Sequence, residues 1–153
     1  HERVWGEQEY ADRLRPRIDA HRSAGRWSYL GVLSQDEMVS FFQALDVLVV
    51  PSLNSTESFG LVQIEAMMKG VPSVASDLPG VRQPVRLTGM GEVVPVGDAD
   101  ALATALIRLL ERPDRHTGDP AALVKQFHPD RAATAYESLF EEIRSELGQG
   151  SST

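Results

Sequence analysis

The chain has 153 residues, the length of one domain, and a formal net charge of −7 at pH 7. That charge argues against nucleic acid or an anionic membrane surface as the main partner. The sequence contains no cysteine, which excludes disulfides, a thiol nucleophile and a thiolate metal site. The lack of cysteine is consistent with a cytoplasmic protein, which we expect. No apolar run reaches the ~20 residues that cross a bilayer, and membrane association is not indicated. Because the sequence begins at His1 within a polar segment, we also expect it to be a piece of a longer protein.

The first expected element is an amphipathic helix over residues 7–21. Its narrow apolar stripe has a four-residue spacing and consists of Tyr10, Leu14 and Ile18. Pro16 interrupts the stripe, so the helix should kink there or end near Arg15, because proline lacks the backbone donor of a helix interior. Residues 23–25 are typical of a turn.

Residues 26–33 alternate in polarity and are rich in aromatic side chains, which predicts a strand. The next four residues, Ser34 to Glu37, read Ser-Gln-Asp-Glu. A serine followed three positions later by glutamate is a capping box, in which each side chain accepts the backbone N–H of the other residue. We expect the helix that it opens to continue to Leu45.

The stretch 47–76 predicts one strand–helix–strand unit. The sequence VLVV at 47–50, closed by Pro51, is typical of a strand buried on both faces. A polar segment over 52–58 precedes FGLVQIEAMMK, a helical sequence that Gly70 ends. Apolar residues return at 71–75 as a second strand. A helical crossover joins parallel strands, so the stretch predicts an α/β fold with a parallel sheet.

The helix over 59–69 shows almost no polar face in a helical projection, apart from a narrow stripe with Glu65 and Lys69. Its apolar residues are Phe59, Leu61, Val62, Ile64, Ala66, Met67 and Met68. Two interpretations of Glu65 are open. It forms an i, i+4 ion pair with Lys69, worth roughly 0.2–0.5 kcal/mol, or it points at a polar ligand above the sheet, because a carboxylate on so apolar a helix needs a partner.

The loop before this helix favours the ligand. Glu57 lies eight residues before Glu65, just ahead of the helix, and Gly60 removes side-chain bulk at its first turn. An anion could then meet the free N–H groups of Phe59, Gly60, Leu61 and Val62. Parallel sheets bind ligands beyond the carboxyl ends of their strands, where this loop begins. Carboxylates beside a phosphate-binding helix start suit a nucleotide-sugar, although Glu57 could instead only complement the helix dipole.

A loop over 76–80 and a final strand over 92–96 follow. The next helix, over about 100–112, ends before Pro113 and has one apolar face with Leu102, Leu106 and Leu109. A loop with Gly118 and Pro120 leads to a last helix from about Pro129. Its stripe at three-to-four spacing, which could complete the local core, comprises Tyr136, Leu139, Phe140, Ile143 and Leu147. We expect residues 1–147 to form one partial domain and 148–153 a disordered tail.

Residues 51–76, PSLNSTESFGLVQIEAMMKGVPSVAS, closely resemble the E-x7-E signature of retaining GT-B glycosyltransferases, in particular glycosyltransferase family 4 (group 1). That family has a Glu-x-Phe-Gly turn, a Glu-Ala-Met helix and a Gly-x-Pro start to the next strand, in this order. The matching residues are Glu57, Phe59, Gly60, Glu65, Ala66, Met67, Gly70 and Pro72. A looser resemblance extends from about Trp27 to the C-terminal helix.

The resemblance implies a Rossmann-like, nucleotide-sugar-binding domain, the C-terminal half of a GT-B fold. It implies that Glu65 binds the ribose hydroxyls and that Glu57, the candidate catalytic residue, orients the transferred sugar. The donor phosphates would meet the amides of residues 59–62, and Val32 and Leu33 would contact the base mainly through backbone. Neither a metal nor another cofactor is expected, and the scattered histidines suggest none: His1, His21, His116 and His128.

Some family features are missing from this sequence. Pro79 takes the place of the first glycine of the family's Gly-Gly turn, Gly80 matches the second, and Gln83 stands where many members have glutamate. Pro79 and Gly80 then serve as turn residues. The family's first strands, with a basic loop for the diphosphate, are also absent, as is the N-terminal acceptor domain. We therefore expect a sheet-completing segment or partner, or an altered sheet, and no activity from the chain alone.

Two other classes of function remain open on the sequence alone. A non-catalytic regulator could keep the nucleotide-binding unit without the transfer chemistry. A flavodoxin-like signalling domain has a similar coarse pattern, but it needs a phosphoacceptor aspartate in an acidic pocket. Asp46 precedes its strand and Asp77 has no acidic neighbours in the sequence, so both are poor candidates for that role.

Overall fold

The computed structural model of the chain describes residues 8–112, 116 and 118–149. The chain divides into two compact units, His1–Val39 and Ser40–Thr153, and each is described by itself. Within the described residues, no helix has both the length and the apolar character needed to cross a bilayer.

The first unit contains α1 (Gln8–Ser23), which continues through Pro16. Of the two expected outcomes, a kink at Pro16 or an end near Arg15, the end is therefore wrong: proline removes one backbone hydrogen bond, and about two turns of helix remain on each side of it. Exposed ion pairs of 3.0 Å lie before and after the proline, Asp12 with Arg15 and Asp19 with Arg22. The hydrogen bonds from Arg15 and Gln8 lower the pKa of the Asp12 carboxyl. No residue of α1 is buried, so its apolar stripe contributes no core.

The strand predicted over 26–33 is not formed. These residues have no regular secondary structure, and most of their side chains are exposed, Val32 completely. A strand is stable only beside another strand that satisfies its backbone groups. Within the described residues no strand pairs with this segment, so its alternating pattern has nothing to pack against.

The capping box is confirmed at the start of α2 (Gln35–Gln43), which ends two residues before Leu45. The Glu37 carboxylate accepts hydrogen bonds from the Ser34 N–H at 2.8 Å and from the Ser34 hydroxyl at 2.7 Å. The Ser34 Oγ in turn accepts the Glu37 N–H at 3.4 Å. The hydrogen bonds that the Ser34 hydroxyl and the Ser34 N–H donate to the carboxylate lower the pKa of the Glu37 carboxyl.

Acid should weaken this cap. Because the pKa of Glu37 is lower in the folded state, its stabilisation is complete above the ordinary glutamate pKa of about 4.3 and disappears as the pH falls through the lowered value. We expect the Glu37 carboxyl to titrate below the ordinary range in an NMR titration, and Ser34→Ala to raise its pKa. A Glu37 titration that Ser34→Ala leaves unchanged would contradict the cap's role.

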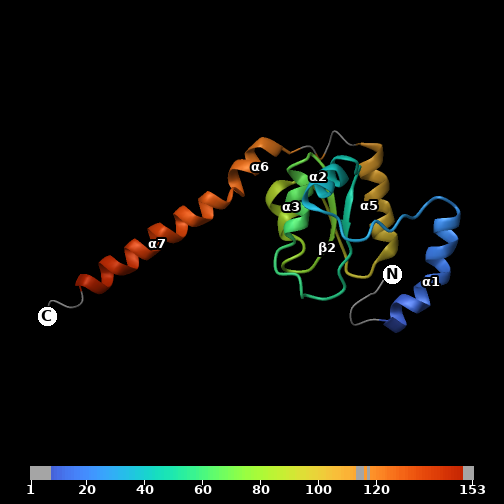
Figure 1. The fold of residues 1–153 in the computed structure, drawn as a ribbon, viewed down its shortest axis with the longest axis horizontal. Coiled ribbons are helices and arrows are strands. Elements are labelled where there is room, and N and C mark those ends of the chain that lie inside the picture. The colour runs from blue at the N-terminus through green and yellow to red at the C-terminus, as the bar shows by residue number, and fades with distance from the viewer. Residues whose placement is uncertain (1–7, 113–115, 117, 150–153) are drawn as a thin grey trace. The chain divides into compact units, whose positions relative to one another are not determined.

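The second unit is built on three parallel strands in the order β1-β2-β3, which are β1 (Leu48–Val50), β2 (Ser73–Ser76) and β3 (Gly91–Val94). The α/β fold and the parallel strand–helix–strand unit are thereby confirmed. The central strand β2 is buried over its whole length, because it has a neighbour on each edge and helices on both faces. Figure 1 shows α3 (Leu61–Met67) and α5 (Ala99–Glu111) on opposite sides of β2.

The side chains of β2 alternate between the two faces of the sheet. Ala75 packs in the core under α3. The other buried residues of this core are Ile64, Met67, Val81, Val85, Met90 and Leu123. Val74 packs in the core under α5, with Val94, Ala105 and Leu109. The helix predicted at 100–112 thus buries the face that its sequence indicated, and the Asp98 side chain caps its start by accepting the Ala101 N–H at 2.9 Å.

Two short helices on the α3 face were not predicted: α4 (Gln83–Thr88) and α6 (Pro120–Gln126). Each has a proline in its first turn, where proline is compatible with a helix. Asp119 caps α6 by accepting the Ala122 N–H at 3.0 Å, so the pair Asp119-Pro120 is a start signal rather than part of a loop.

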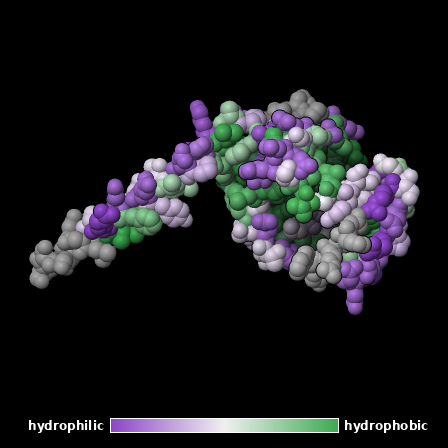
Figure 2. Space-filling view, viewed as in Figure 1, coloured by the Kyte–Doolittle hydropathy of each residue, from purple (hydrophilic) through white to green (hydrophobic). Residues whose placement is uncertain are grey.

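The last helix, α7 (Pro129–Gln149), begins at Pro129 as predicted. Its apolar stripe does not complete the local core, contrary to that expectation. The four described residues of the stripe are 44–62 % exposed: Tyr136, Leu139, Phe140 and Ile143. Hydrophobic side chains accordingly reach the surface of α7 (Figure 2). The helix includes Gly148 and Gln149, and residues 150–153 of the predicted tail lie outside the described residues.

Candidate functional site

The turn between β1 and α3 places Glu57 at the start of the helix. The Gly60 N–H donates a hydrogen bond of 3.0 Å to Oε1 of Glu57. Gly60 is the N-cap residue of α3 and has a left-handed backbone, with φ 78° and ψ 53°. A residue with a Cβ atom is strained in this region, so glycine is what allows the chain to turn from Glu57 into the helix.

Three of the four predicted amides remain available. Gly60 has already given its N–H to Glu57, whereas Phe59, Leu61 and Val62 have N–H groups with no acceptor within the described residues. The helix begins at Leu61, two residues later than predicted. A carboxylate therefore stands beside a small group of free backbone donors.

Glu65 is exposed and forms no ion pair with Lys69 within the described residues, which removes the first of the two interpretations. It lies one helical turn after Leu61, whose side chain is 62 % exposed. The helix therefore has a wider exposed face than the predicted narrow stripe. This face runs from the turn that holds Glu57 to Glu65.

The loop after β2 packs against the turn that holds Glu57. A Cβ atom on Gly80 would lie 2.3 Å from the carbonyl oxygen of Glu57 and 2.5 Å from that of Ser58. Only glycine permits this close approach of two backbones, which supports a structural role for Gly80. The Gln83 amide closes the same turn by donating to the Pro79 carbonyl oxygen at 2.9 Å.

Asp77 in this loop accepts hydrogen bonds from Arg82 at 2.8 Å and from Arg86 at 3.4 Å. These contacts are unlike the acidic pocket of a phosphoacceptor aspartate. Asp46 precedes β1 and Asp77 follows β2, so the two aspartates belong to opposite ends of the parallel sheet. The described residues contain no cluster of histidine and carboxylate side chains that could hold a metal ion.

Gln63 is the site residue that the sequence analysis missed. It is fully buried on the sheet side of α3. Its Nε2 donates to the Val81 carbonyl oxygen at 2.7 Å, and its Oε1 accepts the Ser73 hydroxyl at 2.9 Å. An uncharged polar residue among the apolar positions of a buried helix was the available signal, because such a side chain needs internal partners.

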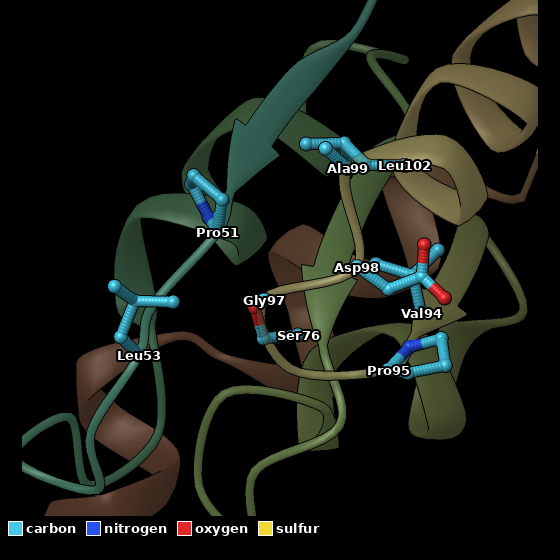
Figure 3. Close-up of a pocket in the computed structure, with 9 residues that line it drawn as sticks. All are labelled: Pro51, Leu53, Ser76, Val94, Pro95, Gly97, Asp98, Ala99 and Leu102. Carbon is cyan, nitrogen blue, oxygen red and sulfur yellow. The ribbon is translucent and has the colours of Figure 1, made fainter.

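A cavity of about 140 Å³ opens at the carboxyl edge of the sheet. It lies on the α5 face, and Figure 3 shows it between the ends of the three strands and the start of α5. Its lining is mostly apolar and includes Pro51, Leu53, Ser76, Pro95 and Leu102. None of the six predicted site residues in 57–65 lines it. Val32 and Leu33 belong to the other compact unit.

Comparison with known proteins places the chain in a family. Residues 3–126 match the profile of the glycosyl transferases group 1. The phosphatidyl-myo-inositol mannosyltransferase of Mycolicibacterium smegmatis is 38% identical over 105 residues, which are 69% of this chain and 27% of that protein. The 2-deoxystreptamine N-acetyl-D-glucosaminyltransferase of Streptomyces fradiae is 32% identical over 148 residues, which are 97% of this chain and 35% of that protein. The chain thus spans about a third of the length of these relatives.

Solved structures show the same fold. The sucrose-phosphate synthase of Thermosynechococcus elongatus superposes with a TM-score of 0.74 and 29% identity, over 90% of this chain and 35% of that one. HepE of Anabaena in complex with UDP-glucose gives a TM-score of 0.71 at 23% identity, over 93% of this chain and 38% of that one. The fold is that of the C-terminal, Rossmann-like half of GT-B proteins. The chain therefore belongs to the glycosyl transferases group 1 family.

Proposed function

We propose that this chain is the donor-binding part of a retaining glycosyltransferase that uses a nucleotide-diphosphate sugar. The observation that carries the proposal is the Glu57 carboxylate, which the Gly60 N–H holds beside three free amides at the start of the helix that bears the exposed Glu65. Family membership supports it, and so do relatives named as glycosyltransferases and a neighbouring structure that contains UDP-glucose.

The backbone amides and the two glutamates contact different parts of the donor. The N–H groups of Phe59, Leu61 and Val62 face the donor phosphates, where backbone donors at a helix start stabilise negative charge, while the Gly60 N–H stays bonded to Glu57. The exposed Glu65 binds the ribose hydroxyls. Glu57 accepts hydrogen bonds from hydroxyls of the transferred sugar and stabilises positive charge that develops on it. The chemistry uses no metal ion.

The rest of the machinery belongs to the longer protein. We propose that an acceptor-binding domain and a sheet-completing segment accompany this chain, which has no transferase activity by itself. The three-stranded sheet supports this, because β1 has a single neighbour within the described residues. A second candidate is a nucleotide-binding module without transfer chemistry, which the departures at Pro79 and Gln83 from the family's turn favour. Donor binding without sugar transfer by the longer protein would select this second candidate.

The donor is tested by thermal unfolding of the longer protein with UDP, GDP, ADP and their sugars. A ligand at 100 times its Kd stabilises the folded state by about 2.7 kcal/mol, so one nucleotide should raise the Tm by several degrees. We expect one base to be selected and both its diphosphate and its sugar to bind. No shift with any of these ligands would contradict the proposed function.

A further inference from the structure

We propose that Gln63 is a positioning residue that fixes the Glu57 turn against the loop after β2 and so sets the geometry of the donor site. The inference rests on the proposed function for the identity of the ligand. The contacts themselves do not depend on the ligand, because they join residues of the protein to one another. All of these residues belong to the second compact unit.

The Gln63 side chain reaches three parts of the site from the buried face of α3. Its Nε2 donates to the carbonyl oxygen of Val81, the residue after Gly80, and its Oε1 accepts the hydroxyl of Ser73 on β2. On its other side it lies against Gly60, where a Cβ atom would come within 2.6 Å of Nε2. The Gln63 backbone N–H also donates to the Gly60 carbonyl oxygen at 2.9 Å.

Gly60 and Gly80 are the two points through which these contacts reach Glu57. Gly60 donates its N–H to the Glu57 carboxylate, and Gly80 lies against the Glu57 and Ser58 carbonyl groups. The amide of Gln63 fills the space where a side chain on the first glycine would lie, and it is hydrogen-bonded to the residue that follows the second. A shift of this amide therefore moves Gly60 and the loop at Gly80, and the Glu57 carboxylate moves with them.

A buried amide suits this task because it donates and accepts at once. Both of its partners, the Val81 carbonyl and the Ser73 hydroxyl, are left without a hydrogen bond if an apolar side chain replaces it, and this penalty locks the arrangement. A purely structural core position would be filled more simply by leucine or methionine.

The test uses Gln63→Met, which keeps the length of the side chain and removes both side-chain hydrogen bonds. The matched control is Leu106→Ala, which weakens the core on the α5 face, across the sheet. Both variants should lower the Tm. Only Gln63→Met should speed amide hydrogen exchange at Gly60 and weaken donor binding, each by about five- to tenfold, the effect of about one lost hydrogen bond.

Two further variants keep the test decisive if Gln63→Met does not fold. Ser73→Ala removes one of the two hydrogen bonds and should give a smaller change in the same direction. Gln63→Glu should lose protection of Gly60 relative to the wild type at the same pH, once its carboxyl is ionised, because a carboxylate cannot donate to the Val81 carbonyl oxygen. Wild-type Gly60 exchange in all three variants would overturn the proposal. Because exchange is measured without ligand, failure of the wild type to bind any donor would sink only the proposed function.

Discussion

Replacing Gly91 with alanine should unfold the protein. Gly91 has φ 137°, a conformation that is essentially restricted to glycine, and it pairs with Ser73 at the start of the β2–β3 ladder. A Cβ atom there would lie 1.8 Å from the Ser73 carbonyl oxygen, which is well inside van der Waals contact. The clash is with backbone, so it is relieved only if the two strands separate. We expect a loss of more than about 4 kcal/mol, comparable to the whole stability of a small domain.

Gly89 provides the matched control for this prediction. It has a left-handed φ of 69°, but a Cβ atom on it would meet no atom within 4 Å. Gly89→Ala should therefore lose only the backbone strain, about 1–2 kcal/mol. Urea denaturation followed by circular dichroism compares the two variants. Equal losses for Gly91→Ala and Gly89→Ala would show that the tight β2–β3 contact is not a determinant of stability.

Replacing Glu65 with alanine should weaken nucleotide binding by about ten- to a hundredfold, without a loss of stability. The reason for the first effect is that hydrogen bonds to a charged group contribute about 1.5–3 kcal/mol. The reason for the second is that Glu65 is exposed and has no partner within the described residues to lose. Calorimetry of the longer protein with the nucleotide selected by the thermal panel measures the affinity.

A change in the ligand sharpens the same test. If Glu65 binds the ribose hydroxyls, the wild type should prefer the nucleotide over its 2′,3′-dideoxy form, and Glu65→Ala should bind the two equally. Glu111→Ala removes an exposed glutamate at the end of α5 and should behave as the wild type. A Glu65→Ala variant that still discriminates between the two nucleotides would refute the ribose assignment.

The parts of the fold that the sequence predicted well are those with strong local signals. The apolar run at 47–50 contains β1, although its three residues are only partly buried and not buried on both faces as predicted, because β1 has one neighbouring strand within the described residues. Gly70, with φ 84°, lies in the turn after α3, where the Val71 N–H donates to the Ala66 carbonyl oxygen, but the helix itself ends at Met67, two residues earlier than predicted. The Ser34–Glu37 capping box depends on residues three apart, so its geometry is also local. Such features form from a few neighbouring residues, so their formation depends little on contacts with distant parts of the chain.

The errors arose where a distant partner decides the outcome. Residues 26–33 have the composition of a strand but no neighbouring strand within the described residues, and α7 has an apolar stripe that stays exposed. Gln63 was overlooked for the same reason, because its partners Ser73 and Val81 lie 10 and 18 residues away. The contact of Gly80 with the Glu57 turn also joins two loops across the helix, and no sequence spacing indicates it.

The most direct test of the donor site is the NMR spectrum of the longer protein titrated with the selected nucleotide-sugar. We predict that the largest chemical-shift changes fall on the backbone amides of residues 57–65, with the Gly60 N–H among them. Changes that instead gather at the apolar cavity around Leu53 and Leu102, or that leave residues 57–65 unmoved at saturation, would contradict the site described here.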